Sequence, residues 1–218
     1  MKEEKELYFI SRLGADKRVF DNLAIQQKYK SKHIKWIKPE NHNLKKYVQK
    51  LKLQIDETKQ IILIGVSFGG IIAQELSKII KTDKVIIISS LRNRNELPQL
   101  YKFLGWTKIQ KIIPAKLLTI GNPFVYWLFG LKSEKEIETF KKILADSDPK
   151  FMKWAINEIV LWKGNATESD LIEIHGDKDK ILYHPKRENV ITIKIGGHLM
   201  IMNKAEEINS IIEQIIES

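Results

Sequence analysis

Two kinds of apolar pattern alternate along this chain. Short apolar runs, which are typical of buried strands, fall at 7–11, 34–37, 61–66, 85–89, 171–174 and 190–195. Apolar positions with helical spacing predict helices over 17–24, 44–53, 71–80 and 204–216. Strands that alternate with helices are typical of a parallel sheet with crossover helices, so the sequence predicts an α/β domain.

The stretch 92–165 interrupts this alternation, because it shows no clear strand. Prolines divide it into short helical pieces, and it contains most of the tryptophans of the chain. We therefore predict a core made of residues 1–91 and 166–218, with a helical lid over 92–165 inserted after the fourth strand. Most of its aromatic rings are expected to pack the lid onto the core, and Trp106 and Trp127 are candidates for the substrate pocket.

Composition narrows the class of protein. The chain has 218 residues, 43% of them hydrophobic, which suits one globular α/β domain. No apolar run is long enough to span a membrane, and the charged N-terminus shows no signal region, so we expect a cytoplasmic location. The chain has no cysteine, which excludes disulfides, cysteine metal sites and a thiol nucleophile.

The formal net charge of +10 comes mostly from lysines that are spread along the whole chain. A nucleic-acid surface more often clusters arginines and interleaves them with aromatic residues, so we expect no nucleic-acid partner. A basic surface can instead steer an anionic substrate or an acidic carrier protein towards the molecule.

The stretch 61–70 carries the clearest chemical motif, a predicted buried strand that runs through G-x-S-x-G into a predicted helix. A serine at such a corner is exposed at the carboxyl end of the sheet and often has a strained backbone. Gly65 and Gly69 flank Ser67 where a Cβ would collide with the neighbouring strand or helix. The motif predicts a nucleophile at Ser67, the alternative being a glycine-rich turn with an incidental serine.

A serine nucleophile needs a base, and the base needs a carboxylate that orients it. His198 follows the sixth strand through a Gly-Gly turn and is the candidate base, whereas His33 and His42 are expected at the surface and His175 is interpreted as structural. Asp177 and Asp179 both follow the fifth strand and are candidates for the acid. A metal site at His175, Asp177 and Asp179 lacks further ligands nearby, and we expect no metal and no cofactor.

The order of these motifs resembles that of small, lid-bearing members of the α/β-hydrolase superfamily of serine hydrolases. The most specific parts are the G-x-S-x-G corner and the stretch G-G-H-L-M-x-x-N-x-A-E-E. The resemblance implies a three-layer sandwich with a mostly parallel six-stranded sheet in the order 2-1-3-4-5-6. It implies the triad Ser67, Asp179 and His198, with Asp179 favoured over Asp177 because the family commonly carries H-G-x-x-D.

Two backbone N–H groups are expected to bind the oxyanion. One is that of Phe68, at the start of the helix that follows the corner at Ser67 (the elbow helix). The other, by resemblance, is that of Leu13. Many relatives have glycine just before the second donor, where this chain has Arg12. The arginine is expected to strain the loop, to fill part of the pocket, to bind a substrate carboxylate, or to point to solvent.

The function predicted from these residues is hydrolysis of carboxylic esters or thioesters of small to medium apolar substrates through an acyl-enzyme on Ser67. The alternative is a non-hydrolytic member of the same fold that binds a small apolar ligand, or a lyase or C–C hydrolase.

Overall fold

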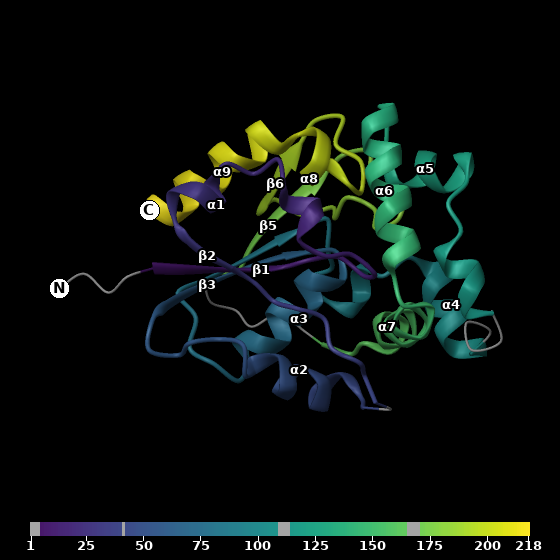
Figure 1. The fold of residues 1–218 in the computed structure, drawn as a ribbon, viewed down its shortest axis with the longest axis horizontal. Coiled ribbons are helices and arrows are strands. Elements are labelled where there is room, and N and C mark those ends of the chain that lie inside the picture. The colour runs from purple at the N-terminus through teal and green to yellow at the C-terminus, as the bar shows by residue number, and fades with distance from the viewer. Residues whose placement is uncertain (1–4, 41, 109–113, 165–170) are drawn as a thin grey trace.

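A parallel sheet of six strands forms the centre of the computed structural model, which describes residues 5–40, 42–108, 114–164 and 171–218 (Figure 1). The strands are β1 (Lys5–Ile10), β2 (Lys30–His33), β3 (Gln60–Val66), β4 (Lys84–Ile88), β5 (Leu171–Gly176) and β6 (Val190–Ile193). Their order is β2-β1-β3-β4-β5-β6 and every neighbouring pair is parallel. The predicted α/β class and strand order are confirmed.

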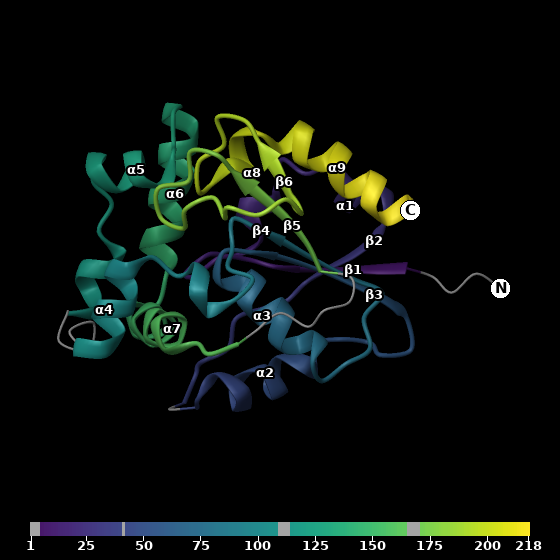
Figure 2. The same ribbon diagram turned by 180° about the vertical axis from the view of Figure 1, so that it is seen from behind.

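Helices cover both faces of the sheet and complete three layers, as the two opposite views show (Figures 1 and 2). On one face lie the 3-10 helix η1 (Lys17–Phe20), α1 (Ile25–Lys28), α8 (Met200–Asn203) and α9 (Ala205–Glu217). On the other face lie α2 (Leu44–Lys52) and α3 (Phe68–Ser77). The crossover helices that the sequence pattern predicts are therefore present.

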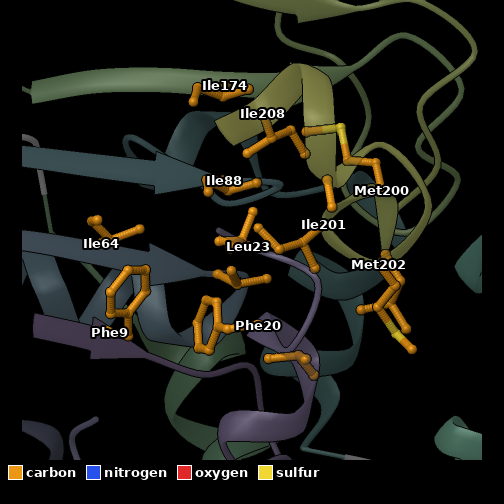
Figure 3. Packing of buried hydrophobic residues seen from close by; sticks show 14 of the residues in the cluster. Phe9, Phe20, Leu23, Ile64, Ile88, Ile174, Met200, Ile201, Met202 and Ile208 are labelled. Atoms are coloured by element: carbon orange, nitrogen blue, oxygen red, sulfur yellow. The ribbon is translucent and has the colours of Figure 1, made fainter. Parts of the chain in front are cut away.

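Each central strand is buried on both faces, and its side chains alternate between two cores. Phe9, Ile64 and Ile88 point to the face of α9, where they pack with side chains such as Phe20 and Ile208 (Figure 3). Their neighbours Tyr8, Leu63 and Ile87 point to the face of α2 and α3. Burial on both faces explains why these strands are continuous apolar runs in the sequence.

Between β4 and β5 the described residues form helices joined by loops, and no strand. We call residues 92–164 the helical segment; it contains η2 (Arg94–Glu96), α4 (Gln99–Thr107), η4 (Ala115–Thr119), α5 (Pro123–Phe129), α6 (Glu134–Asp146) and α7 (Pro149–Leu161). Prolines open α5 and α7, where the missing N–H costs no helical hydrogen bond. The helices α4, α5 and α6 gather beyond the carboxyl ends of the strands (Figure 1). Residues 109–113 and 165 of the predicted lid lie outside the described residues.

The prediction of the second strand at 34–37 is wrong, because β2 comes just before it. This strand pairs only with β1 at the edge of the sheet, so it needs no apolar run. A polar side chain of β2 pairs with one of β1, because Lys32 Nζ lies 3.1 Å from the buried carboxylate of Glu6. The apolar residues Ile34 and Trp36 leave the sheet and pack against the core on the α3 face.

Three smaller predictions also need correction. The helix predicted over 17–24 is a 3-10 helix that ends at Phe20, followed by the separate short α1. The elbow helix begins at Phe68 rather than at 71, directly after the corner. His33 is not a free surface residue, since its ring stacks 5.4 Å from that of Phe9. No helix of the described ranges is long and apolar enough to cross a membrane.

Candidate active site

Ser67 occupies a strained corner between β3 and α3. Its φ of 55° is positive, which a residue with a side chain adopts only when the surroundings enforce it. The surroundings do so through the backbone: Ser67 N donates to Ile88 O at 2.9 Å, and Ser67 O accepts from Gly70 N at 2.9 Å and from Ser90 Oγ at 2.7 Å. The hydroxyl of Ser67 is thereby held at the carboxyl end of the central strands.

The two glycines of the motif have the steric role that the sequence predicts. A Cβ on Gly65 would overlap with the carbonyl oxygen of Gly69, across the corner. A Cβ on Gly69 would overlap with the carbonyl oxygens of Ile10 and Ser11, at the end of β1. The start of α3 therefore lies directly against the loop that follows β1, and this contact requires glycine.

His198 comes from the turn after β6 and is 2% exposed. Its Nε2 lies 2.9 Å from Ser67 Oγ, and its Nδ1 lies 2.8 Å from Asp179 Oδ2. Because the carboxylate can only accept a hydrogen bond, Nδ1 carries the hydrogen, and Nε2 is the atom that accepts one from the serine. The structure thus brings together three residues that are far apart in the sequence.

Asp179 is buried in the turn after β5, and every contact of its carboxylate favours the ionised form. Oδ1 accepts hydrogen bonds from the backbone N–H groups of Ile181 and Leu182, at 2.8 and 2.9 Å. Burial alone raises the pKa of Asp179, but the charge of His198 and hydrogen bonds from His175 and His198 outweigh burial and hold the pKa below its ordinary value.

The structure also separates the two candidate acids. Asp177 is exposed and accepts a hydrogen bond from Ile195 N at 2.7 Å. Ile195 is a β-branched residue with a φ of 58°, so this hydrogen bond helps to hold a strained turn before His198. Asp177 shapes the loop, whereas Asp179 contacts the histidine.

A buried contact that sequence reasoning missed lies behind Asp179. His175 is 1% exposed, and its Nε2 lies 2.8 Å from Leu182 O and 3.3 Å from Asp179 Oδ2. Its Nδ1 lies 3.3 Å from Glu173 Oε1, and Glu173 in turn pairs with Arg187. The sequence signal is the polar pair Glu173 and His175 inside an otherwise apolar strand, of which only His175 is considered above, where it is interpreted as structural.

The loop after β1, where the second oxyanion donor is expected, is anchored at both sides. Ser11 Oγ donates to Ala15 O at 2.6 Å, and Trp36 Nε1 lies 2.9 Å from both oxygens. Leu13 lies inside this loop and packs partly buried against both cores. Phe68 is the first residue of α3, so its N–H has no acceptor within the helix.

Arg12 does not point to solvent, which removes one of the expected alternatives. Its side chain is 3% exposed, and its guanidinium lies over the rings of Phe129 and Phe140. Burial lowers the pKa of Arg12 to about 10, so the group is still charged at neutral pH. Phe129 also lies 5.6 Å from the ring of His198, edge to face. Phe129 and Phe140 were absent from the sequence-based candidates.

The two tryptophans proposed for the pocket lie at the outside of the helical segment. Trp106 on α4 is 79% exposed and Trp127 on α5 is 56% exposed. Their rings contact Phe103 and Phe124, which are themselves exposed, and Lys180 covers Trp127. The structure does not bring these two indoles to Ser67. Within the described residues, no group of three or more His, Asp or Glu is arranged to hold a metal ion.

Comparisons with known proteins rest on structure, since no family model and no curated protein matches the sequence. A carboxylesterase of the thaumarchaeon Nitrososphaera gargenis is similar with a TM-score of 0.74 and 14% identity, over 99% of this chain and 90% of that one. A lipase-esterase related protein from Clostridium acetobutylicum has a TM-score of 0.69 and 16% identity, over 98% and 95%. MenH from S. aureus has a TM-score of 0.70 and 16% identity, over 100% and 95%. At this level of identity the likeness shows a shared fold.

Proposed function

We propose that this chain, which has the α/β-hydrolase fold, is a serine hydrolase that cleaves carboxylic esters or thioesters of small to medium substrates. The observation that carries the proposal is the continuous hydrogen-bonded series of Ser67 Oγ, His198 and Asp179, with separations of 2.9 and 2.8 Å. A serine, a histidine and a buried carboxylate in this arrangement are the groups that acyl transfer requires.

In the proposed mechanism Ser67 Oγ attacks the carbonyl carbon of the substrate while its proton moves to His198 Nε2. Asp179 Oδ2 accepts the Nδ1–H of the imidazolium and stabilises its charge. The tetrahedral intermediate collapses, His198 returns the proton to the departing alcohol or thiol, and the acyl group stays on Ser67. A water molecule then gives a proton to His198 Nε2 and attacks the acyl-enzyme. When the second tetrahedral intermediate collapses, His198 returns this proton to Ser67 Oγ and the carboxylic acid leaves.

The oxyanion of the intermediate is proposed to bind the backbone N–H groups of Phe68 and Leu13. The N-terminal position of Phe68 in α3 supports this role, because the free N–H and the helix dipole both favour negative charge there. The contact of Gly69 with the end of β1 supports the role of Leu13, because it holds the loop of Leu13 against the start of α3.

We also propose that the helical segment is the lid of this site. Its support is the contact between α5 and the histidine turn: Leu199 N donates to Phe129 O at 3.0 Å, and Gly130 lies against Gly197. The ring of Phe129 faces the imidazole of His198. An acyl or alcohol group that binds beneath α5 and α6 would meet the rings of Phe129 and Phe140 together with the guanidinium of Arg12. The net charge of +10 supports an anionic substrate or an acidic carrier of the acyl group.

The test is covalent labelling with a fluorophosphonate, followed by turnover of p-nitrophenyl esters and acyl thioesters of graded length. We expect one probe on Ser67 of the native chain, none on Ser67→Ala, and a fall in kcat of about 10⁴- to 10⁶-fold in this variant. Ser210→Ala serves as the matched control, since this serine lies on α9 and its hydroxyl donates to Glu206 O within the same helix. Labelling or turnover that survives in Ser67→Ala would remove the proposal.

The second candidate function is a member of the same fold that binds a small apolar ligand, or that acts as a lyase or C–C hydrolase. The observation in its favour is Arg12, which stands where many relatives have glycine beside the oxyanion site. It predicts an intact chain that binds a metabolite but neither reacts with the fluorophosphonate nor hydrolyses any ester of the series.

A further inference from the structure

Arg12 is a buried cation at the edge of the proposed active site. It follows Ser11 at the carboxyl end of β1, in the loop against which Gly69 and the start of α3 pack. A side chain that is 3% exposed has lost nearly all of its hydration. Such a charge is stable in a protein only when hydrogen-bond acceptors or opposite charges replace the lost water.

One edge of the guanidinium has no such replacement. Arg12 Nη1 donates to Leu13 O at 3.0 Å, which fixes the orientation of the group. Nε and Nη2 are buried and make no hydrogen bond to any residue that the structure describes. Nε and Nη2 lie side by side on one edge, and this pair of donors matches the two oxygens of a carboxylate.

The neighbours of Arg12 compensate its charge only in part. The guanidinium carbon lies 4.7 Å from the ring centre of Phe140 and 5.3 Å from that of Phe129. Aromatic faces attract a cation but accept no conventional hydrogen bond. No carboxylate in the parts of the chain that the structure describes pairs with Arg12, in contrast to Arg18, which binds both Asp16 and Asp146.

Arg12 and the proposed base contact the same aromatic ring. The ring of Phe129 contacts the guanidinium of Arg12 on one side and lies 5.6 Å from the imidazole of His198 on another. The carbonyl that Arg12 binds is that of Leu13, whose N–H is the proposed second oxyanion donor. The free edge therefore lies beside the loop of the proposed second oxyanion donor and beside a ring that contacts the proposed base.

We propose that the Nε–Nη2 edge of Arg12 binds a carboxylate of the substrate, and that the enzyme is selective for esters or thioesters that carry a free carboxylate, such as the monoesters of dicarboxylic acids. This inference rests on the proposed hydrolase function and names its substrate class. The carboxylate of the substrate would pair with the charge of Arg12, which no carboxylate of the described residues neutralises.

The test compares matched substrates that differ only in charge. The p-nitrophenyl monoesters of succinic, glutaric and adipic acid carry the carboxylate, and the corresponding methyl p-nitrophenyl diesters lack it. Rates are corrected for spontaneous hydrolysis, and the measured quantity is the ratio of kcat/KM between acid and diester. For at least one chain length we expect a ratio of roughly 10 to 100 in the native enzyme, the range of a charged hydrogen-bonded contact.

Two variants and one control test whether Arg12 causes the preference for the acid over the diester. Arg12→Gln should bring the ratio to about one or below, and Arg12→Lys, which keeps the charge but loses the planar pair of donors, should give an intermediate ratio. Arg18→Gln should keep the native ratio. Because a ratio does not depend on the amount of folded enzyme, a loss of stability in one variant leaves the comparison valid.

The outcomes separate this inference from the hydrolase proposal. If the fluorophosphonate labels Ser67 and the diesters are cleaved, but no length prefers the acid or Arg12→Gln keeps the preference, the carboxylate site is refuted and the hydrolase stands. If the fluorophosphonate labels no residue, the binding of free dicarboxylates tests the carboxylate site. Titration calorimetry of succinate, glutarate and adipate with the Ser67→Ala chain should show a Kd that rises at least tenfold when Arg12→Gln is added. Absent binding, or a Kd that Arg12→Gln leaves unchanged, overturns the inference.

Discussion

His175 Nε2 lies 3.3 Å from Asp179 Oδ2, the same oxygen that accepts a hydrogen bond from His198 Nδ1. One carboxylate oxygen therefore lies between two imidazoles. On its other side His175 faces Glu173, so a buried polar network continues from the proposed catalytic groups to Arg187. His175 does not touch Ser67 and acts on the site only through Asp179, which makes it a candidate positioning residue.

Replacing His175 by phenylalanine should therefore affect both stability and rate. The change removes the imidazole that contacts two buried carboxylates and the carbonyl of Leu182, and we expect a loss of about 2–4 kcal/mol in the free energy of unfolding. We expect kcat to fall roughly tenfold with little change in KM, since the orientation of His198 depends on Asp179. Urea unfolding and steady-state kinetics measure the two effects.

His42→Phe is the control for that variant, because the ring Nδ1 of this histidine contacts the backbone carbonyl of Glu40 at the surface, and the bonds of His42 to Pro39 and Trp154 are made by its backbone. It should change stability by less than about 0.5 kcal/mol. The positioning role would be wrong if His175→Phe lost stability while kcat and its pH profile stayed native.

The two aspartates of the acid loop should respond differently to amidation. Asp179→Asn should lower kcat/KM by roughly 10⁴-fold, because an amide no longer stabilises the imidazolium and favours the wrong tautomer. Asp177→Asn should change it less than tenfold, because the amide oxygen still accepts the hydrogen bond from Ile195 N. Equal losses in the two variants would contradict the assignment of the acid.

Asp179 should also contribute to stability in a way that depends on pH. Its pKa is lower in the folded protein than in the unfolded chain, so its contribution is present above the ordinary carboxylate range and is lost as the pH falls through the folded value. The native chain should therefore exceed Asp179→Asn in unfolding free energy most clearly at neutral pH, and the difference should shrink on acidification. Urea unfolding of both at pH 7 and pH 3 checks the sign.

Gly69→Ala tests the contact between the elbow and the end of β1. The new Cβ would overlap with backbone oxygens of Ile10 and Ser11, which cannot move without displacing the strand. We expect a loss of at least about 3 kcal/mol in unfolding free energy, or no soluble protein. In the control Gly121→Ala the new Cβ meets the hydroxyl end of Tyr126 at 2.7 Å, and this side chain can rotate away. Comparable losses in both variants would show that the close approach is not specific to the corner.

Arg12→Met tests whether the buried guanidinium is kept for stability. Methionine retains an apolar stem and removes a charged group whose Nε and Nη2 have no hydrogen-bond partner among the described residues, so we expect the unfolding free energy to rise by about 1–2 kcal/mol. Arg18→Met, which breaks exposed ion pairs, should lower it by about 0–1 kcal/mol. Thermal and urea unfolding give both values. A strong loss of stability in Arg12→Met would mean that the guanidinium is a structural element.

The sequence by itself determined the α/β class, the positions of five of the six strands to within a few residues, and the corner at Ser67. These features depend on local patterns. A buried parallel strand must be apolar on both faces, and the close approach of α3 to β1 demands glycine at a fixed distance from the serine. The sequence pattern did not predict the edge strand β2, because a strand with one neighbouring strand does not need a run of apolar residues.

Only the tertiary structure decided which side chains meet. His198 was predicted from its place after a strand, whereas the preference for Asp179 over Asp177 rested on resemblance, and only the folded chain shows that Asp179 contacts His198 while Asp177 accepts from Ile195 N. The burial of Arg12 depends on rings from α5 and α6, more than a hundred residues away in the sequence. Spacing along a chain describes neighbours on one strand or helix. The partners of a buried charge are set by the packing of distant segments, which no local pattern contains.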